Sequence, residues 1–408
     1  MTIPTQPQSP VDSTHAMNNR RELALPGLLL GGALTVGAFA ALLAVLNAVP
    51  SSHNALPDYP DWASEVPHEL VARLQWLLGD ITEPQFYKSW VASLGLLAGA
   101  TVGWWALRAK KRWAGEPIAY GTGLWPWMLG AAGLSLVLSN ALFGGSLDSG
   151  WQPTFVPFVC VATSVILVYG RGWTKLLTGA ILGAFTTPLA MVLIDHVTGP
   201  LSLPPVVANT TSMSIGAALT FLLCRALPWM RRPTSEPESQ EETVVAKKAA
   251  PTLLGDTRWM IRRIITDFTE TQFYANEWAS IGLIVGAIVT TVLNPSFASY
   301  GTGLLPKIML AQALTSAIGI IIWRHLYRDG GWAPTYISVV SVAPATVLAH
   351  GNSVTALVLG AMSGAVLCPV IARPISKVLP DDFHPFIGNT VSMAISTAVI
   401  VPTIGHLV

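Results

Sequence analysis

Charged residues are scarce in this sequence. Asp, Glu, Lys and Arg make up 11% of its 408 residues, whereas soluble globular domains contain about 25%. This shortage excludes a soluble globular fold for most of the chain. The formal net charge of +1 also excludes a nucleic-acid partner recruited by bulk positive charge.

Cysteine and metal-ligand patterns are nearly absent as well. The three cysteines, Cys160, Cys224 and Cys368, lie in apolar segments, where a thiol is usually a small buried hydrophobe. The eight histidines show no ligand-like spacing, and no P-loop, dinucleotide fingerprint or nucleophile elbow occurs in a suitable context. We therefore expect no disulfide framework, no bound metal, no resident cofactor and no catalytic residues, so the protein is not predicted to be an enzyme.

Apolar residues, in contrast, make up 51% of the chain, and the mean hydropathy is +0.52. A helix that spans a bilayer needs about 20 apolar residues, and eleven stretches approach that length. The sequence therefore predicts an all-α polytopic membrane protein. The expected transmembrane helices lie near residues 25–49, 91–108, 124–144, 155–170, 175–195, 209–228, 279–293, 304–323, 334–349, 354–372 and 389–405.

Two polar stretches organise the chain. Residues 1–24 are polar and are predicted to form a cytoplasmic tail. The apolar run at 25–49 is longer than the core of a cleaved signal peptide, which has about 7 to 15 residues, so we expect a retained transmembrane helix. Residues 231–255 are rich in charged side chains without a large apolar run, and this composition predicts a solvated cytoplasmic linker.

The stretches on either side of this linker, residues 65–230 and 256–408, repeat one set of motifs in the same order. Each stretch holds five of the expected helices, so the chain is predicted to contain two transmembrane repeats. The matching blocks are 80–87 and 267–274, 120–123 and 300–303, 151–155 and 332–336, the Gly, Gly and Pro at 179, 183 and 188 and at 360, 364 and 369, and 209–213 and 389–393.

An odd number of helices in each repeat predicts that the second repeat enters the membrane from the opposite side, which is an inverted topology. Cytoplasmic loops collect Lys and Arg, and a cytoplasmic N-terminus assigns most cations to cytoplasmic loops and only Arg73 and Lys88 to the opposite ones. We therefore expect a multi-pass protein of the plasma or inner membrane with its C-terminus on the opposite side. The cations assigned to the cytoplasmic loops are Arg108, Lys110, Lys111, Arg112, Arg171, Lys175, Arg231, Arg232, Lys247, Lys248, Arg258, Arg262, Arg263, Arg324, Arg328, Arg373 and Lys377.

The first repeated block has the form of a helix capping box. Thr82 is followed by Gln85, and Thr269 by Gln272, so each Thr could cap a helix while the Gln three positions later reaches back. The neighbouring acids would then favour the positive end of the helix. An acid-base or cation site built from these acids is the alternative, although the inverted topology would place the two blocks on opposite membrane faces.

The last repeated block is the predicted substrate or ion site. Each copy follows a proline-containing segment and opens an apolar helix with Asn, Thr and Ser. In transporters with inverted repeats, broken helices at corresponding positions mark the binding site, so neutral oxygens here could bind a polar solute or Na⁺. The alternative is that both Asn residues are interfacial helix caps. The candidate residues are Asn209, Thr210, Ser212, Asn389, Thr390 and Ser392.

Three further pairs are candidates for a pathway or a hinge. Thr122 and Thr302 follow glycine-permitted turns, Thr154 and Thr335 follow a Trp-x-Pro motif, and Pro188 and Pro369 could kink their helices. A surface loop, an interfacial anchor and a static kink are the respective alternatives.

These patterns favour a secondary active or facilitative transporter that moves a small polar or amphipathic solute by alternating access. The resemblance to carriers with two inverted five-helix repeats is one of general architecture and names no substrate. Because the spans carry almost no acids, Na⁺ coupling or facilitation is favoured over proton coupling. A passive channel and a non-transporting membrane scaffold or lipid-handling protein are the alternatives. Membrane lipids and an unknown small molecule are the expected partners, and small-residue helix faces would suit a homo-oligomer.

Overall fold

The computed structural model describes residues 23–49, 55–145, 151–232 and 252–408. The predicted polar tail and most of the linker therefore lie outside the described residues. All regular secondary structure in the described segments is helical, which confirms the all-α prediction.

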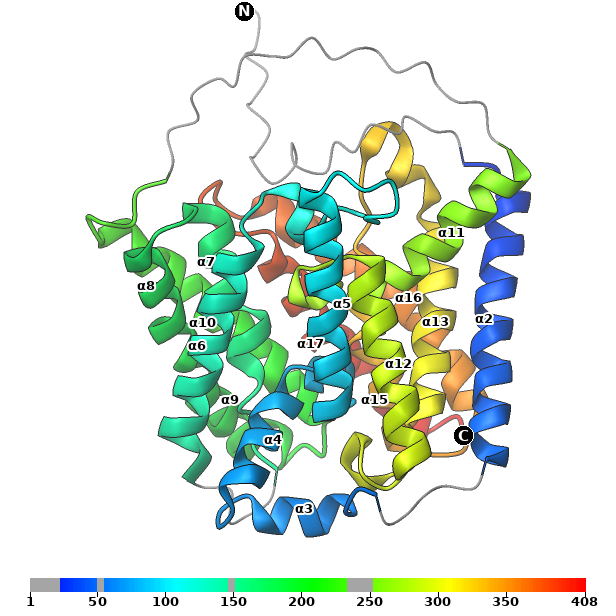
Figure 1. The fold of residues 1–408 in the computed structure, drawn as a ribbon, viewed down its shortest axis with the longest axis horizontal. Helices are drawn as coiled ribbons and strands as arrows, with labels where there is room; N and C mark the ends of the chain where they lie inside the picture. Colours follow the sequence, from blue (N-terminus) through cyan, green and yellow to red (C-terminus); the bar gives the residue numbers. More distant parts are fainter. Residues whose placement is uncertain (1–22, 50–54, 146–150, 233–251) are drawn as a thin grey trace, which may run out of the picture.

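The part of the chain before the linker contains one long N-terminal helix, a short helix and the predicted first repeat (Figure 1). Its helices are α2 Leu25–Ala48, α3 Tyr59–Glu65, α4 Leu70–Asp80, η1 Glu83–Gln85, α5 Trp90–Arg108, η2 Ile118–Gly121, α6 Trp125–Phe143, η4 Val156–Val159, α7 Val161–Tyr169, α8 Trp173–Ala184, α9 Thr186–Leu193, η5 Ile194–Thr198 and α10 Pro205–Ala226.

The part after the linker follows the same succession of long and short elements. Its helices are α11 Leu253–Asp267, η6 Glu270–Gln272, α12 Glu277–Leu293, η7 Ser299–Gly301, α13 Leu305–Ile322, η8 Arg324–Gly330, α14 Tyr336–Val339, α15 Val342–His350, α16 Val354–Val378 and α17 Phe386–Gly405.

Eight of the described helices are long and apolar enough to cross a membrane, and shorter apolar helices occupy Val156–Tyr169, Glu277–Leu293 and Tyr336–His350. Together these are the segments predicted from hydropathy, with ends that shift by a few residues. A polytopic membrane protein is thus supported. Helices α3, α4 and α11 were not predicted, because these segments contain too many polar residues to stand out as spans.

Local sequence explains where several helices begin. Ser89 caps α5 by accepting a hydrogen bond from the Ala92 N–H, and Asn276 caps α12 by accepting from the N–H groups of Trp278 and Ala279. Helices α6, α10 and α13 carry a proline in their first turn, where the missing N–H costs nothing.

Helices α5 and α12 lie against each other at the centre of the molecule (Figure 1). Their backbones touch because glycines face glycines: a Cβ atom added at Gly282 would overlap the carbonyl oxygen of Gly95, and one added at Gly95 would overlap that of Gly282. A small residue at such a contact lets two helices approach without intervening side chains.

We therefore expect Gly282→Ala to lower the free energy of unfolding by about 1 to 3 kcal/mol, the usual cost of inserting a methyl group into a packed interior. Gly133→Ala on α6 is the matched control, because no atom lies within 4 Å of its added Cβ. Melting of the two detergent-purified variants measures the difference. Equal melting temperatures would show that α5 and α12 are not in close contact.

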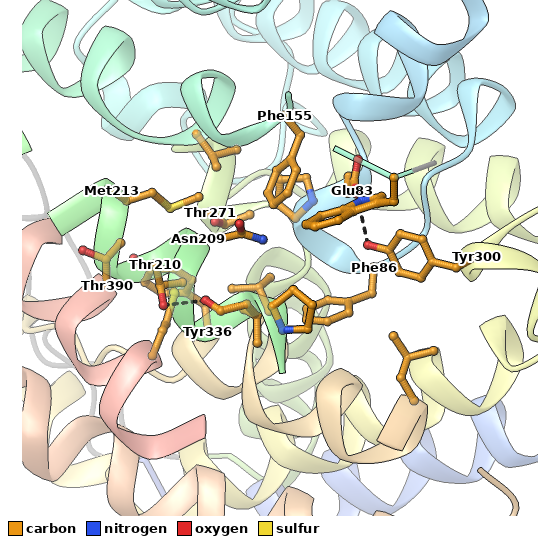
Figure 2. A pocket seen from close by; sticks show the side chains of 18 of the residues that line it. Glu83, Phe86, Phe155, Asn209, Thr210, Met213, Thr271, Tyr300, Tyr336 and Thr390 are labelled. Carbon is orange, nitrogen blue, oxygen red and sulfur yellow. Dashed lines mark hydrogen bonds between the residues drawn. The ribbon is translucent and has the colours of Figure 1, made fainter. Parts of the chain in front are cut away.

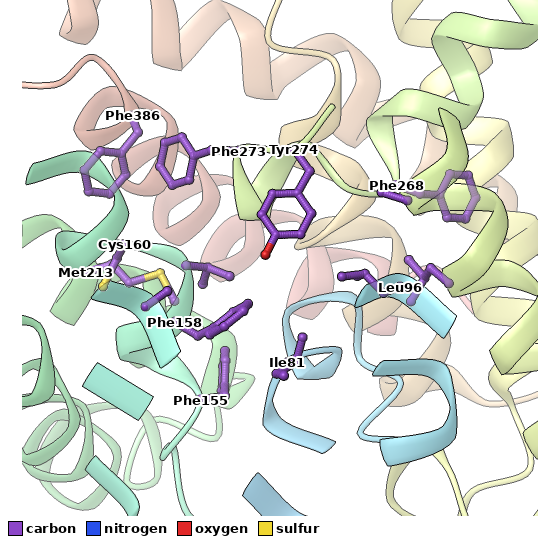
Figure 3. Packing of buried hydrophobic residues seen from close by; sticks show 14 of the residues in the cluster. Ile81, Leu96, Phe155, Phe158, Cys160, Met213, Phe268, Phe273, Tyr274 and Phe386 are labelled. Atoms are coloured by element: carbon purple, nitrogen blue, oxygen red, sulfur yellow. The ribbon is translucent and has the colours of Figure 1, made fainter. Parts of the chain in front are cut away.

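The two parts of the chain share one hydrophobic core around this contact. Figure 3 shows Phe155 and Phe158 from the first part beside Phe273 and Phe386 from the second. This shared core holds the two parts together.

Two corresponding loops lie at opposite ends of the molecule. The loop between α5 and α6 lies at the end where α2 begins, whereas the loop between α12 and α13 lies at the other end, beside α3 (Figure 1). The backbone N–H of Tyr59 in α3 donates to the carbonyl of Ser296, at 2.9 Å, which fastens α3 to that second loop.

Candidate functional site

Two breaks of the same shape interrupt the chain at the first repeated block. One lies between α4 and α5 and contains η1, and the other lies between α11 and α12 and contains η6. The short helix in each break ends in a phenylalanine with left-handed backbone, Phe86 at φ 67° and Phe273 at φ 63°. A left-handed conformation is costly for a residue with a side chain, so its occurrence at both breaks indicates a geometry that the surrounding contacts impose.

The capping-box prediction for this block is wrong. Neither Thr82 nor Thr269 makes a side-chain cap with the short helix that follows it. The Thr82 hydroxyl instead donates to the carbonyl of Ser89, at 3.0 Å, and accepts from the Ser89 N–H, at 3.2 Å. Thr82 thereby ties the end of α4 to the start of α5 across the break.

The glutamines of this block connect the two breaks to each other. The Gln85 amide donates to the Gln272 side-chain oxygen, at 2.8 Å, and the Gln272 amide donates back to Gln85, at 2.9 Å. The same amides also donate to the carbonyls of Phe268 and Ile81. Blocks that the sequence analysis assigned to opposite membrane faces therefore meet in the interior.

A buried charge cluster surrounds the first break. Asp80, Glu83 and Lys88 have side chains with 0% exposure, and Lys88 pairs with Asp80 and with Glu83, the latter at 2.6 Å. The Lys88 ammonium also lies 3.7 Å from the centroid of the Trp76 ring. Three ionisable groups thus share one buried site.

Neutral donors complete the contacts of this cluster. Trp151 donates its indole N–H to Glu83, and the Tyr300 hydroxyl donates to the same Glu83 oxygen at 3.2 Å. Asn140 donates to Asp80 at 2.9 Å. Hydrogen bonds to buried carboxylates are among the stronger ones in proteins, so they hold both acids in place.

An equivalent cluster surrounds the second break. Arg263 pairs with Asp267, at 2.5 Å, and with Glu270. The Trp332 indole donates to Glu270 at 2.6 Å, as Trp151 does to Glu83, and the Thr335 hydroxyl donates to Asp267 at 2.8 Å.

The cation comes from a different sequence position in each cluster: Lys88 follows its short helix η1, whereas Arg263 precedes η6. In the alignment of the repeats, the position of Lys88 is occupied by Ala275 and the position of Arg263 by Trp76. Each cluster nevertheless contains two carboxylates and one cation. The two clusters therefore have the same net charge. This supports a common electrostatic role, because such a role depends on the net charge and not on which helix supplies the cation.

These clusters correct two sequence-based expectations. Lys88 and Arg263 were assigned to loops, but Lys88 is fully buried and the Arg263 side chain is only 13% exposed. The interior was expected to be almost free of charge, yet it contains both clusters. Hydropathy counting missed them because short polar breaks separate α4 from α5 and α11 from α12.

A cavity of about 340 Å³ lies between the first break, the second break and the starts of α10 and α17 (Figure 2). Its wall is mostly aromatic and aliphatic, with a few polar groups. It is lined by Tyr59, Glu83, Pro84, Phe86, Trp151, Phe155, Val159, Pro205, Val206, Asn209, Thr210, Met213, Thr271, Phe273, Tyr300, Tyr336, Val340, Leu348, Phe386, Thr390 and Met393. A concave apolar site with few polar groups is typical of small-molecule binding.

Three of the six predicted site residues line this cavity, namely Asn209, Thr210 and Thr390. The Asn209 side-chain oxygen is buried and has no hydrogen-bond partner among the described residues. The Thr210 hydroxyl donates to the carbonyl of Val206 in its own helix, at 2.7 Å. Thr390 is within hydrogen-bond distance of Ser214, at 2.8 Å, which joins α17 to α10.

The other three predicted site residues lie behind the wall. Asn389 donates to the Tyr336 hydroxyl at 3.0 Å, Ser212 donates to the carbonyl of Asn209 and Ser392 to that of Cys368, both at 2.7 Å. Their polar groups are thus satisfied within the protein. The helices α10 and α17 begin at this level and are not broken within it.

The candidate pathway threonines have local partners. Thr122 and Thr302 donate to carbonyls three residues earlier, both at 2.8 Å, in turns away from the cavity. Thr154 accepts from the Trp76 indole at 3.2 Å, and Thr335 donates to Asp267. The last two therefore belong to the walls of the charge clusters.

The two candidate hinge prolines differ. Pro188 lies in α9 shortly after Phe185, where α8 ends and α9 begins, whereas Pro369 lies inside the continuous helix α16. A Cβ atom added to the nearby repeated glycines would contact a neighbouring helix. The glycines and their first contacts are Gly179 with Val165, Gly183 with Ser135, Gly360 with Thr346 and Gly364 with Ser338.

Two carboxyl groups outside the spans have shifted pKa values. Hydrogen bonds from Arg225, at 2.6 and 2.7 Å, lower the pKa of Asp382, so this pair between α10 and the loop before α17 is charged at neutral pH. Burial, followed by the proximity of Glu277, raises the pKa of Glu116 in the loop after α5. The Arg225–Asp382 pair and the hydrogen bond from the Glu116 backbone N–H to the Glu277 carboxylate both join the first part of the chain to the second.

Sequence reasoning did not identify Glu83, Trp151 and Tyr300 as one set. All three lie in repeated blocks, so the repetition itself was the available signal. The described residues contain no group of His, Cys, Asp and Glu side chains that could hold a metal ion.

No known family model matches the sequence, and a search of curated proteins finds no significant similarity.

Proposed function

We propose that the protein is a secondary carrier that moves a small amphipathic solute across a membrane by alternating access. The observation that carries this proposal is the position of the cavity, which is bounded by corresponding segments of both parts of the chain. Solute sites of carriers with internal repeats lie at the interface between the repeats.

The asymmetry of the cavity also supports alternating access. Glu83, Trp151 and Tyr300 line it, whereas the corresponding Glu270, Trp332 and Tyr120 do not. In a carrier with inverted repeats, the two repeats exchange conformations when access changes sides. The cavity described here is then one of two equivalent states, the one that extends toward α3.

The proposed topology is two inverted five-helix repeats preceded by α2. The opposite placement of the α5–α6 and α12–α13 loops agrees with this topology (Figure 1). We propose that the end with the start of α2 is cytoplasmic, because the basic loop that contains Lys110 and Lys111 lies there.

The structure removes the reason given in the sequence analysis for favouring Na⁺ coupling over proton coupling. That preference rested on an interior without acids, but Glu83 is both buried and part of the cavity wall. Buried ionisable groups beside a transport pathway are candidates for ion or proton coupling.

Asn209→Ala is the direct test of this site. Without a solute, we expect the variant to melt at the same or a higher temperature than the wild type, because a buried carbonyl without a partner costs about 1 to 3 kcal/mol. With a transported solute, we expect about tenfold weaker binding, because one hydrogen bond is lost. The melting temperatures of the wild type and the variant, measured without solute and with a panel of amines, amino acids, nucleosides and NaCl, test both the stability and the binding.

Asn389→Ala is the matched control, because the Asn389 amide is already bound to Tyr336. This variant should melt at a lower temperature than the wild type, with or without solute. Uptake of the stabilising solute into proteoliposomes then tests transport. Undiminished uptake by a folded Asn209→Ala variant would remove Asn209 from the site, and a stabilising solute that never crosses the membrane would exclude the carrier function.

A further inference from the structure

The unused hydrogen-bonding groups of the cavity wall indicate what it can bind. The Asn209 oxygen and the Tyr59 hydroxyl have no partner among the described residues, although both side chains are at least nine-tenths buried. The Asn209 oxygen can only accept a hydrogen bond, and the Tyr59 hydroxyl can accept one. A ligand with N–H or O–H donors would satisfy them.

The charges beside the wall are negative in sum. The lining residues include no Lys, Arg or His, and Glu83 is their only carboxylate. The charged groups that act on Glu83 are Lys88 and Asp80, so two carboxylates share one ammonium. The contacts from Trp151, Tyr300 and Asn140 are neutral and leave this count unchanged. A buried excess of one negative charge is unfavourable unless a cation or a proton compensates it.

The rest of the wall suits a cation with an apolar body. Eight aromatic side chains face the cavity, and the face of an aromatic ring attracts a cation. These rings also provide the apolar surface that holds a small organic molecule. An anion would find no countercharge on this wall.

We infer that the cavity binds a small organic cation, a protonated amine with an apolar body, with Glu83 as its countercharge and the Asn209 oxygen as a hydrogen-bond acceptor. This inference names the substrate class of the carrier proposed above and rests on that proposal for its role in transport. A proton on Glu83 would balance the charge when the amine is absent.

Three probes of similar shape test the ligand class: 2-phenylethylamine, 2-phenylethanol and 3-phenylpropionate, each added to the purified protein at pH 7.5. The amine is a cation at this pH, the alcohol is neutral and the acid is an anion. We expect the amine to raise the melting temperature most and the anion not at all. Equal shifts with the amine and the alcohol, or a larger shift with the anion, would overturn the inference.

Glu83→Gln tests the countercharge. We expect amine affinity to fall about tenfold or more, because a charged hydrogen bond becomes a neutral one, while the weak effect of the alcohol is unchanged. Glu277→Gln is the control, because Glu277 is a buried acid that does not line the cavity, and its amine affinity should equal that of the wild type. Unchanged amine affinity in a folded Glu83→Gln variant would overturn the inference.

Asn209→Asp gives a second result if the Glu83 variant does not fold. It adds a carboxylate to the wall, so amine affinity should rise, and a fall would overturn the inference. Uptake of radiolabelled 2-phenylethylamine separates the two proposals. Amine binding without uptake contradicts the carrier function alone, whereas uptake of a neutral or anionic solute by a protein that does not bind the amine contradicts only the cation inference.

Discussion

Replacement of Lys88 by methionine is expected to lower the free energy of unfolding by about 3 to 5 kcal/mol, the usual cost of removing one partner of a buried ion pair. Methionine matches the length of the lysine stem, so the packing against Trp76 is largely kept. Asp80 and Glu83 are fully buried and would then face each other without a cation. Thermal melting of the purified variant measures the loss.

The charge explanation of this loss can be separated from packing. In Lys88→Met with Asp80→Asn, one carboxylate remains without a cation, which restores the formal excess of one negative charge. We expect this double variant to regain much of the lost stability. Lys307→Met is the control, because Lys307 pairs with the neutral Asn352, and it should melt near the wild-type temperature. If the double variant is no more stable than the single one, packing and not charge explains the loss.

The helices of this fold were predictable because each long apolar run must satisfy its backbone within a helix. The runs at 354–372 and 389–405, for example, correspond to α16 and α17. Prolines at the predicted starts of α6 and α13 lie in the first turns of those helices. Hydropathy and proline position act locally, so one sequence is sufficient to detect them.

The breaks were not predictable from local signals. Thr82 and Gln85 match a capping box in spacing, but their partners are Ser89, across the break, and Gln272, 187 positions away. The Thr82–Ser89 bond crosses an interruption between two helices, and the Gln85–Gln272 bond requires the two parts of the chain to meet, so neither follows from the spacing of a capping box. Lys88 is buried against Trp76, Asp80 and Glu83, although the charge rule for loops had placed it outside.

Only part of the candidate site was predicted, because the two matching blocks have different surroundings in the structure. Asn209 and Asn389 match in sequence, yet Asn209 lines the cavity while Asn389 is bound to Tyr336. A sequence with two matching blocks cannot indicate which copy faces a cavity, because that depends on the conformation of the whole molecule.

The proposed alternating access predicts that two cysteine reporters at equivalent positions exchange accessibility when a solute is transported. Tyr300 lines the cavity described here, whereas Tyr120, its counterpart in the chain between α5 and α6, does not. In a background without the buried Cys160, Cys224 and Cys368, Tyr300→Cys should react with a membrane-impermeant thiol reagent from the α3 side. Tyr120→Cys, at a position that is partly exposed, should react only from the opposite side and more slowly, because the state that opens this end further is the minor one.

A transported solute should raise the Tyr120→Cys rate and lower the Tyr300→Cys rate, since each turnover passes through both states. A passive channel predicts fast labelling of both reporters at once, and a scaffold predicts rates that no solute changes. The reciprocal change is specific to alternating access, because only a two-state exchange closes one end when it opens the other. Labelling of both cysteines from the same side would contradict the inverted arrangement, because it would place Tyr120 and Tyr300 on one membrane face.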